Sequence, residues 1–131
     1  MLKIMIVDDE IMSVKTLTVM IEKYIDTPHI TKGETDFETA LGLIDSFKPD
    51  LLLLDVVMPP RTGFDFLAQI NPRNFSVIFT TAFDNYAIQA IRYSALDYLL
   101  KPISAEELKS AFARYFETEA SSGQSEQYNH L

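Results

Sequence analysis

The sequence predicts an α/β fold, a doubly wound five-stranded parallel sheet with helices on both faces. Five apolar strand candidates alternate with five helical patterns along the chain, an order that is typical of such sheets. Three candidates contain the runs "IMIV", "LLLL" and "VIFT", which are continuously apolar, as expected of strands covered on both faces. A length of 131 residues, 47% of them hydrophobic, suits one domain with a substantial core.

The first two strand–helix units occupy the N-terminal third of the chain. The first strand is expected over Leu2–Val7, and the helix after it is indicated by a stripe with helical spacing: Ile11, Val14, Thr18, Ile21 and Ile25. The second strand, over residues 29–32, has a weaker pattern because its apolar residues do not form a continuous run. Thr35 and Glu38 predict a capping box at the start of the second helix.

The remaining three units follow in the same order. Strands are expected over residues 50–54, 76–80 and 97–99, the last again with a weak pattern. Helices are expected over residues 63–70, ending before Pro72, and over residues 84–93. Ser104 and Glu107 predict a second capping box, which opens the last helix.

The composition changes near residue 117. The stretch "ETEASSGQSEQYNHL" is polar, lacks a helical stripe and contains Ser-Ser-Gly. We therefore predict one domain over residues 1–117, followed by a linker or disordered tail over residues 118–131.

Charge and cysteine content narrow the function classes. The net charge of −8 argues against this segment gripping nucleic-acid phosphates by itself. The absence of cysteine excludes disulfides and thiolate metal sites, which is compatible with a cytoplasmic location. The apolar run in "MLKIMIVDDE" is too short for a signal peptide or a membrane span, so no membrane role is expected.

Polar residues follow four of the predicted strands. Asp8 and Asp9 come after the first strand, Asp55 ends the third, Thr81 follows the fourth and Lys101 the fifth. Ligands of open α/β sheets bind outside the carboxyl ends of the strands, at the point where the strand order reverses. In the flavodoxin-like order 2-1-3-4-5, strands one and three flank that point. All five side chains are then expected around one crevice.

Three carboxylates in one crevice need compensation. Two of them about 4 Å apart repel by roughly 4 kcal/mol at an effective dielectric near 20. Lys101 supplies only one positive charge, so the cluster either shares protons or binds a cation. An all-oxygen site of this kind suits Mg²⁺.

Each residue taken alone also has an ordinary explanation. Asp8 and Asp9 could favour the positive start of a helix, Thr81 could be a helix-entry residue and Lys101 a surface turn residue. Asp55 resists such an explanation, because helix capping rarely places a carboxylate inside "LLLLDVV". The coincidence of all of them at one sheet edge favours a functional site.

Four segments resemble the receiver domain of two-component response regulators over about residues 2–117. They are "IMIVDDE", "LLLLDVVMPPRTGFDFL", "VIFTTAFDNYAIQAI" and "ALDYLLKPI", and they occur in this order and spacing. The resemblance implies that Asp55 is the phosphoacceptor. It also implies that Mg²⁺ is held by Asp8, Asp9, Asp55 and the main-chain carbonyl of Val57.

The resemblance further assigns the remaining roles. Thr81 matches the switch hydroxyl, Tyr98 the aromatic switch residue, and Lys101 the lysine that assists phosphoryl transfer. The Lys101–Pro102 bond is expected to be cis. A domain of this kind is not an enzyme towards other molecules, and it catalyses only its own phosphorylation and dephosphorylation.

The resemblance also implies partners. The phosphodonor is expected to be a phosphohistidine on a sensor histidine kinase. The stretch "TTAFDNYAIQAIRYSALDYLLKPI" looks most like receivers attached to LytTR-type DNA-binding domains, so DNA contact and transcription regulation would come from a C-terminal domain outside this sequence. A homodimer through the fourth helix, fifth strand and fifth helix is plausible, but Ile91 could equally face its own core.

Two other functions are compatible with a doubly wound sheet. The first is a Mg²⁺-dependent phosphohydrolase with an aspartyl nucleophile, but such enzymes usually carry an Asp-x-Asp pattern after the first strand. The second is a flavodoxin-like cofactor carrier, which would need small or hydroxyl residues where Asp8, Asp9 and Glu10 stand.

Val57 and Phe83, which stand two residues after Asp55 and Thr81, cannot orient an attacking water molecule through their side chains. This predicts a persistent acyl phosphate on Asp55.

Overall fold

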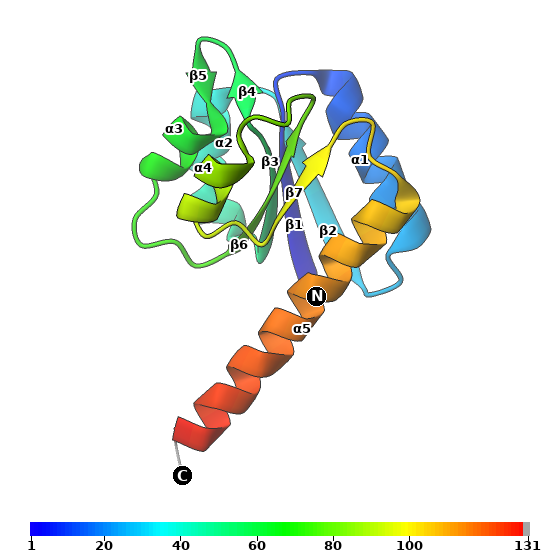
Figure 1. Cartoon of the computed structure of the whole chain (residues 1–131), viewed down its shortest axis with the longest axis vertical. Coiled ribbons are helices and arrows are strands. Elements are labelled where there is room, and N and C mark those ends of the chain that lie inside the picture. Colours follow the sequence, from blue (N-terminus) through cyan, green and yellow to red (C-terminus); the bar gives the residue numbers. More distant parts are fainter. Residues whose placement is uncertain (130–131) are drawn as a thin grey trace.

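A computed structural model describes the backbone of residues 1–129 and the side chains of residues 1–120 (Figure 1). Its elements, in chain order, are β1 (Leu2–Val7), α1 (Ile11–Tyr24), β2 (His29–Glu34), α2 (Phe37–Phe47), β3 (Leu51–Asp55), β4 (Val57–Met58), β5 (Arg61–Thr62), α3 (Gly63–Ala68), β6 (Ser76–Thr81), α4 (Ala87–Arg92), β7 (Asp97–Leu100) and α5 (Ala105–Asn129).

The main sheet is parallel, with the order β2-β1-β3-β6-β7. Counted along the sheet strands alone, this is the predicted order 2-1-3-4-5. Helices α1 and α5 cover one face, and α2, α3 and α4 cover the other (Figure 1). The predicted fold class is confirmed.

The continuous apolar strands are explained by these two layers. Alternate residues of each strand point to opposite faces, so a strand covered on both sides needs an apolar residue at every position. Met5, Leu52 and Phe79 enter the core beneath α2, α3 and α4. Ile4, Leu53 and Ile78 enter the core beneath α1 and α5.

The first predicted capping box is wrong. Asp36, not Thr35, is the N-cap of α2, and its carboxylate accepts the Thr39 N–H at 2.9 Å. A carboxylate at position 36 caps as well as a hydroxyl, and Glu38 is instead engaged by Arg61. A capping box that was not predicted joins Thr62 and Asp65 at the start of α3.

The capping of α5 agrees in part with the prediction. The Ser104 hydroxyl oxygen accepts the Glu107 N–H at 3.1 Å, as expected of an N-cap. The Glu107 carboxylate accepts from the Ser104 hydroxyl at 3.2 Å, where a full capping box would have it accept from the Ser104 backbone.

Helix α5 continues beyond the predicted end of the domain. Its backbone is helical to Asn129 and leaves the body of the molecule (Figure 1). Residues 118–129 were expected to be a linker or disordered tail. Glu, Gln and Ala favour helix, and the packed part of α5 supplies a nucleus for it. The division of the chain at residue 117 stays a prediction, and residues 130–131 lie outside the described residues.

The helix over residues 84–93 was predicted too long, because α4 covers only Ala87–Arg92. The hairpin of β4 and β5 was not predicted, because "MPPR" contains two prolines that indicate a loop.

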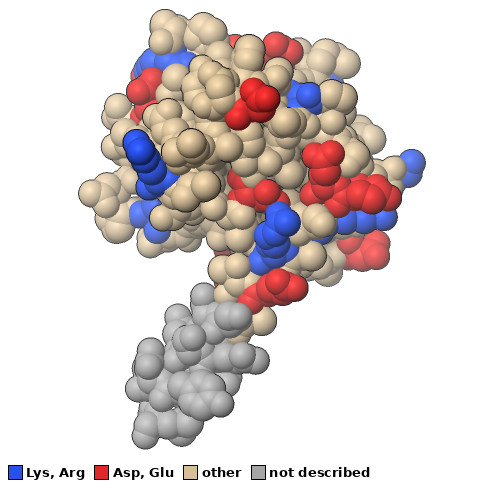
Figure 2. All heavy atoms as spheres, in the orientation of Figure 1, with Lys and Arg blue, Asp and Glu red and all other residues tan. Residues whose placement is uncertain are grey.

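On the face shown in Figure 2, acidic and basic side chains are interspersed. Among the described residues, no helix is both long and apolar enough to cross a membrane.

Candidate functional site

The sheet register brings the predicted site residues to one edge. Val7 is paired with Leu54, so Asp8 and Asp55 follow at the next step of neighbouring strands. Asp55 is paired with Thr80, and Thr81 is paired with Leu100, so Lys101 follows directly. Residues far apart in the sequence therefore meet because parallel strands end together.

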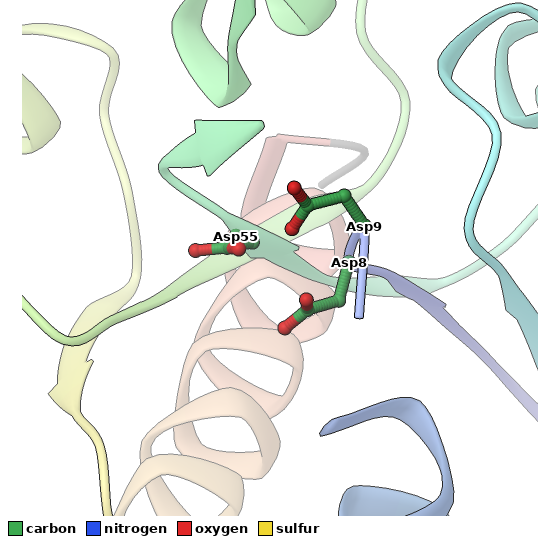
Figure 3. A group of neighbouring side chains, drawn as sticks. All are labelled: Asp8, Asp9 and Asp55. Atoms are coloured by element: carbon green, nitrogen blue, oxygen red, sulfur yellow. The ribbon is translucent and has the colours of Figure 1, made fainter. Parts of the chain in front are cut away.

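The three aspartates form one cluster at this edge (Figure 3). Asp8, Asp9 and Asp55 each offer a carboxylate oxygen, and these oxygens all lie within 4.8 Å of one another. Asp8 is fully buried and Asp55 is 5% exposed, whereas Asp9 is open to solvent. The predicted meeting of these residues is found in the structure.

Lys101 is the cation that faces the cluster. Its Nζ donates to Asp8 Oδ2 at 2.7 Å and lies 3.8 Å from Asp55 Oδ2. It also donates to the Ser13 hydroxyl at 3.3 Å. The backbone holds the lysine in place, since Lys101 N–H donates to the Thr81 carbonyl at 2.7 Å. The Lys101–Pro102 bond is cis, as expected.

Asp55 is held in a costly environment. Burial of its carboxyl, followed by repulsion from Asp8, raises the pKa of Asp55 to about 7. The charge of Lys101 and the N–H of Val57, which donates to Asp55 Oδ1 at 3.4 Å, act in the opposite direction without cancelling the rise. The negative charge of Asp55, the unusual carboxylate of an apolar strand, is thus not fully compensated by the groups around it.

Lys101 keeps its proton firmly. Burial lowers the pKa of its ammonium, but the hydrogen bond with Asp8 and the charges of Asp55 and Asp8 outweigh this effect. The pKa of Lys101 is therefore raised above its ordinary value, and the group is a permanent cation at neutral pH.

The donor set fits a hard divalent cation. Three carboxylates and one ammonium leave an excess of negative charge, and all the nearby ligand atoms are oxygens. Such ions prefer oxygen ligands and compensate clustered carboxylates. Val57, the fourth residue expected to hold the ion, begins the β4–β5 hairpin two residues after Asp55.

Thr81 and Tyr98 both hydrogen-bond to the backbone of Phe83, one on each side of that residue. Thr81 is fully buried, and its hydroxyl oxygen accepts the Phe83 N–H at 3.2 Å. The hydroxyl of the half-buried Tyr98 donates to the Phe83 carbonyl. Burial raises the pKa of Tyr98, so it remains a neutral donor. The two predicted switch residues are therefore linked through the backbone of Phe83.

Gly63 packs against the backbone of Asp55, and the sequence did not predict this contact. A Cβ at Gly63 would lie 2.4 Å from the Asp55 carbonyl oxygen and 3.1 Å from Leu54 Cγ. The Gly63 N–H also donates to the Val56 carbonyl at 2.8 Å. The glycine in "PPRTGFDF" was the available signal, but only the packing shows which backbone comes close to it.

A family model for the response regulator receiver domain matches residues 4–113. Among named relatives, transcriptional regulatory protein BtsR of Escherichia coli K12 is 36% identical over 115 residues, 87% of this chain and 48% of BtsR. Sensory transduction protein LytT of Bacillus subtilis is 33% identical over 132 residues, 99% of this chain and 54% of LytT. The chain spans about half the length of these relatives.

The fold is also similar to that of a solved response regulator structure. A DNA-binding response regulator of the LuxR family from Staphylococcus aureus superposes with a TM-score of 0.74 at 27% sequence identity. The match covers 88% of this chain and 98% of that chain. The resemblance drawn from the four sequence segments is confirmed.

Proposed function

The chain belongs to the response regulator receiver domain family of two-component signalling, and on this basis we propose that Asp55 is its phosphoacceptor. The observation that supports this most is the position of Asp55. It is a buried carboxylate at the carboxyl end of the central strand, beside two further acids and one lysine. A nucleophilic carboxylate needs this combination of access to the sheet edge and nearby positive charge.

The proposed reaction is a single phosphoryl transfer. One Asp55 carboxylate oxygen forms the new O–P bond while the N–P bond of a phosphohistidine breaks, and the imidazole keeps the electron pair and takes up a proton. Lys101 is close enough to Asp55 to pair with phosphoryl oxygens, and the Thr81 hydroxyl supplies a donor. Positioning and charge compensation then account for the catalysis.

We propose that the cation is Mg²⁺, held by Asp8, Asp9, Asp55 and the Val57 carbonyl. When bound, Mg²⁺ supplies a charge that offsets the repulsion between the carboxylate and the incoming phosphoryl group. The carboxylates of Asp8 and Asp9 would hold the ion, and the Lys101 ammonium would compensate part of the remaining negative charge.

The test is intact-mass spectrometry after incubation with acetyl phosphate and Mg²⁺. We expect one added phosphoryl group on the wild type and none on Asp55→Asn. Asp50→Asn is a matched control, because Asp50 stands at the opposite end of β3 and should leave the labelling intact. Label on Asp55→Asn would contradict the assignment, and repeated turnover of p-nitrophenyl phosphate would favour the phosphohydrolase alternative.

The linked contacts of Phe83 support a switch through Thr81 and Tyr98. If the Thr81 hydroxyl turns to a phosphoryl group, it releases the Phe83 N–H, and the Phe83 backbone is then held only through its carbonyl by Tyr98, so that it can move together with Tyr98. This would shift α4 and β7 between two packings. Thr81→Ala is expected to be labelled on Asp55 more slowly, because the hydroxyl donor is gone, and to lose phosphorylation-dependent partner binding once labelled, whereas Thr81→Ser keeps both the labelling rate and the binding.

The partners belong to the same proposal. A hollow of about 270 Å³ adjoins Lys101 and is lined by α1 and the segment after β7, including Met12, Leu17, Pro102 and Ile103. We propose that the phosphohistidine-bearing domain of a sensor histidine kinase docks there, which implies a cytoplasmic location. The likeness to BtsR and LytT supports control of a LytTR-type DNA-binding domain outside this sequence.

A further inference from the structure

The β4–β5 hairpin connects Asp55 to α3 along the chain and contains only two pairs of residues. Val57 is paired with Thr62, and Met58 with Arg61, around a turn at Pro59 and Pro60. A two-stranded hairpin of this size is not stable by itself. Contacts from outside the hairpin must therefore hold it against the rest of the domain.

Arg61 makes such contacts with the first turn of α2. Its guanidinium carbon lies 3.6 Å from the centroid of the Phe37 ring, and its Nη1 donates to Glu38 Oε1. Phe37 is only 8% exposed and packs edge-to-face on Phe66, with ring centroids 5.3 Å apart. Arg61 is thus stacked on a ring that the core already fixes, which suits its planar group.

We propose that Arg61 is a positioning residue for the divalent cation: by fastening the β4–β5 hairpin to the first turn of α2, it fixes the Val57 backbone beside Asp55. The inference rests on the proposed function, in which the Val57 carbonyl is a ligand. The Val57 N–H already contacts Asp55 Oδ1 at 3.4 Å, so this segment borders the acidic cluster.

The direction in which Mg²⁺ affinity changes when Arg61 is removed distinguishes a positioning role from a purely electrostatic one. Arg61 is a cation, so its removal should strengthen Mg²⁺ binding if only long-range electrostatics mattered. Positioning predicts the opposite. Because the Arg61 and Glu38 side chains are 41% and 68% exposed, their ion pair contributes little to folding, and Arg61→Ala should still fold.

The experiment is a Mg²⁺ titration of the full 131-residue chain, followed through backbone amide resonances. For Arg61→Ala we expect Mg²⁺ affinity to fall by about tenfold, the lower end of the range for a lost outer-shell contact around a metal site. The Mg²⁺-induced change at the Val57 amide should shrink more than that at Asp9. Arg61→Lys, which keeps the charge but not the planar stack, should weaken binding less than Arg61→Ala does.

The control is Lys32→Ala, which removes one positive charge from an exposed position on β2 and should leave Mg²⁺ affinity unchanged or slightly higher. An Arg61→Ala protein that binds Mg²⁺ as tightly as the wild type, or more tightly, would overturn the role of Arg61 alone. A wild type with no saturable response to Mg²⁺ would overturn the proposed ion site, and this inference with it.

Discussion

Asp55 shows how a single residue can be unfavourable for folding and still be retained at a reactive site. Its carboxyl is largely buried at the sheet edge, next to Asp8, and lies 3.8 Å from the ammonium of Lys101, which donates to Asp8 at 2.7 Å. The nearest cation is thus engaged mainly by the neighbour. A bound divalent ion would compensate the charge of Asp55. An apolar residue at position 55 would pack without this cost, but it would remove the reactive carboxylate.

The raised pKa of Asp55 makes stability depend on pH in a predictable direction. The pKa is about 7 in the folded chain against 3.8 for the ordinary group, so the protonated form is favoured by folding. Its contribution to the free energy of unfolding is fully present below pH 4 and is lost as pH rises through 7.

We therefore expect Asp55→Asn to be more stable than the ion-free wild type at pH 8, by about 1–3 kcal/mol. At pH 4 the difference should nearly vanish, because both side chains are then neutral. Urea denaturation with a chelator present measures it. Equal stability of the two proteins at pH 8 would show that Asp55 is not desolvated as described.

The side chain of Val57 affects the expected lifetime of the acyl phosphate on Asp55. Neither Val57 nor Phe83 offers a side-chain hydrogen bond to an attacking water. We expect the label on Asp55 to persist well beyond seconds and Val57→Asn to shorten its lifetime several-fold. Decay of labelled protein, followed by intact mass, is the measurement, with Val57→Leu as the apolar control. A wild-type label lost within seconds would refute the prediction.

At the scale of elements, the end of β3 and the start of α3 are packed too closely to admit a side chain. Gly63 is the first residue of α3, and an ideal Cβ there would overlap the carbonyl oxygen of Asp55. The Thr62–Asp65 capping box directs the helix into this position. The element that follows the hairpin thus supports the phosphoacceptor backbone.

We expect Gly63→Ala to lower the free energy of unfolding by about 1–3 kcal/mol, the usual cost of overpacking. It should also slow the labelling of Asp55 by acetyl phosphate, because the backbone of that residue has to move. Gly42→Ala is the matched control: nothing lies within 4 Å of its Cβ, and in the middle of α2 it should stabilise the protein. A neutral Gly63→Ala would contradict the close approach.

At the scale of the whole molecule, α4 presents an apolar surface away from the core. Ile88 is 71% exposed and Ile91 is 74% exposed, so Ile91 does not face its own core, and Phe83 at 50% lies close to the Thr81–Tyr98 contacts. Exposed apolar side chains on a segment that responds to a switch suit a regulated interface. We propose this face for a homodimer that forms on phosphorylation.

Sedimentation velocity of the labelled and unlabelled protein tests the dimer. We expect labelling of Asp55 to shift the wild type towards a dimer, and Ile91→Lys to remove the shift without changing labelling. Val19→Lys is the control, since Val19 is 65% exposed on α1, on the other face of the sheet. A labelled wild type that stays monomeric at high concentration would exclude this interface.

The sequence alone determined the alternation of the five sheet strands with five helices, the parallel sheet and the residues at its carboxyl edge, because these depend on local periodicity and on which residue follows each strand. Tertiary structure decided the rest: that Lys101 bonds to Asp8 more closely than to Asp55, that Gly63 lies against Asp55, and that Arg61 stacks on Phe37. Such contacts join residues far apart in the chain, and their geometry follows from register and packing, which no local pattern encodes.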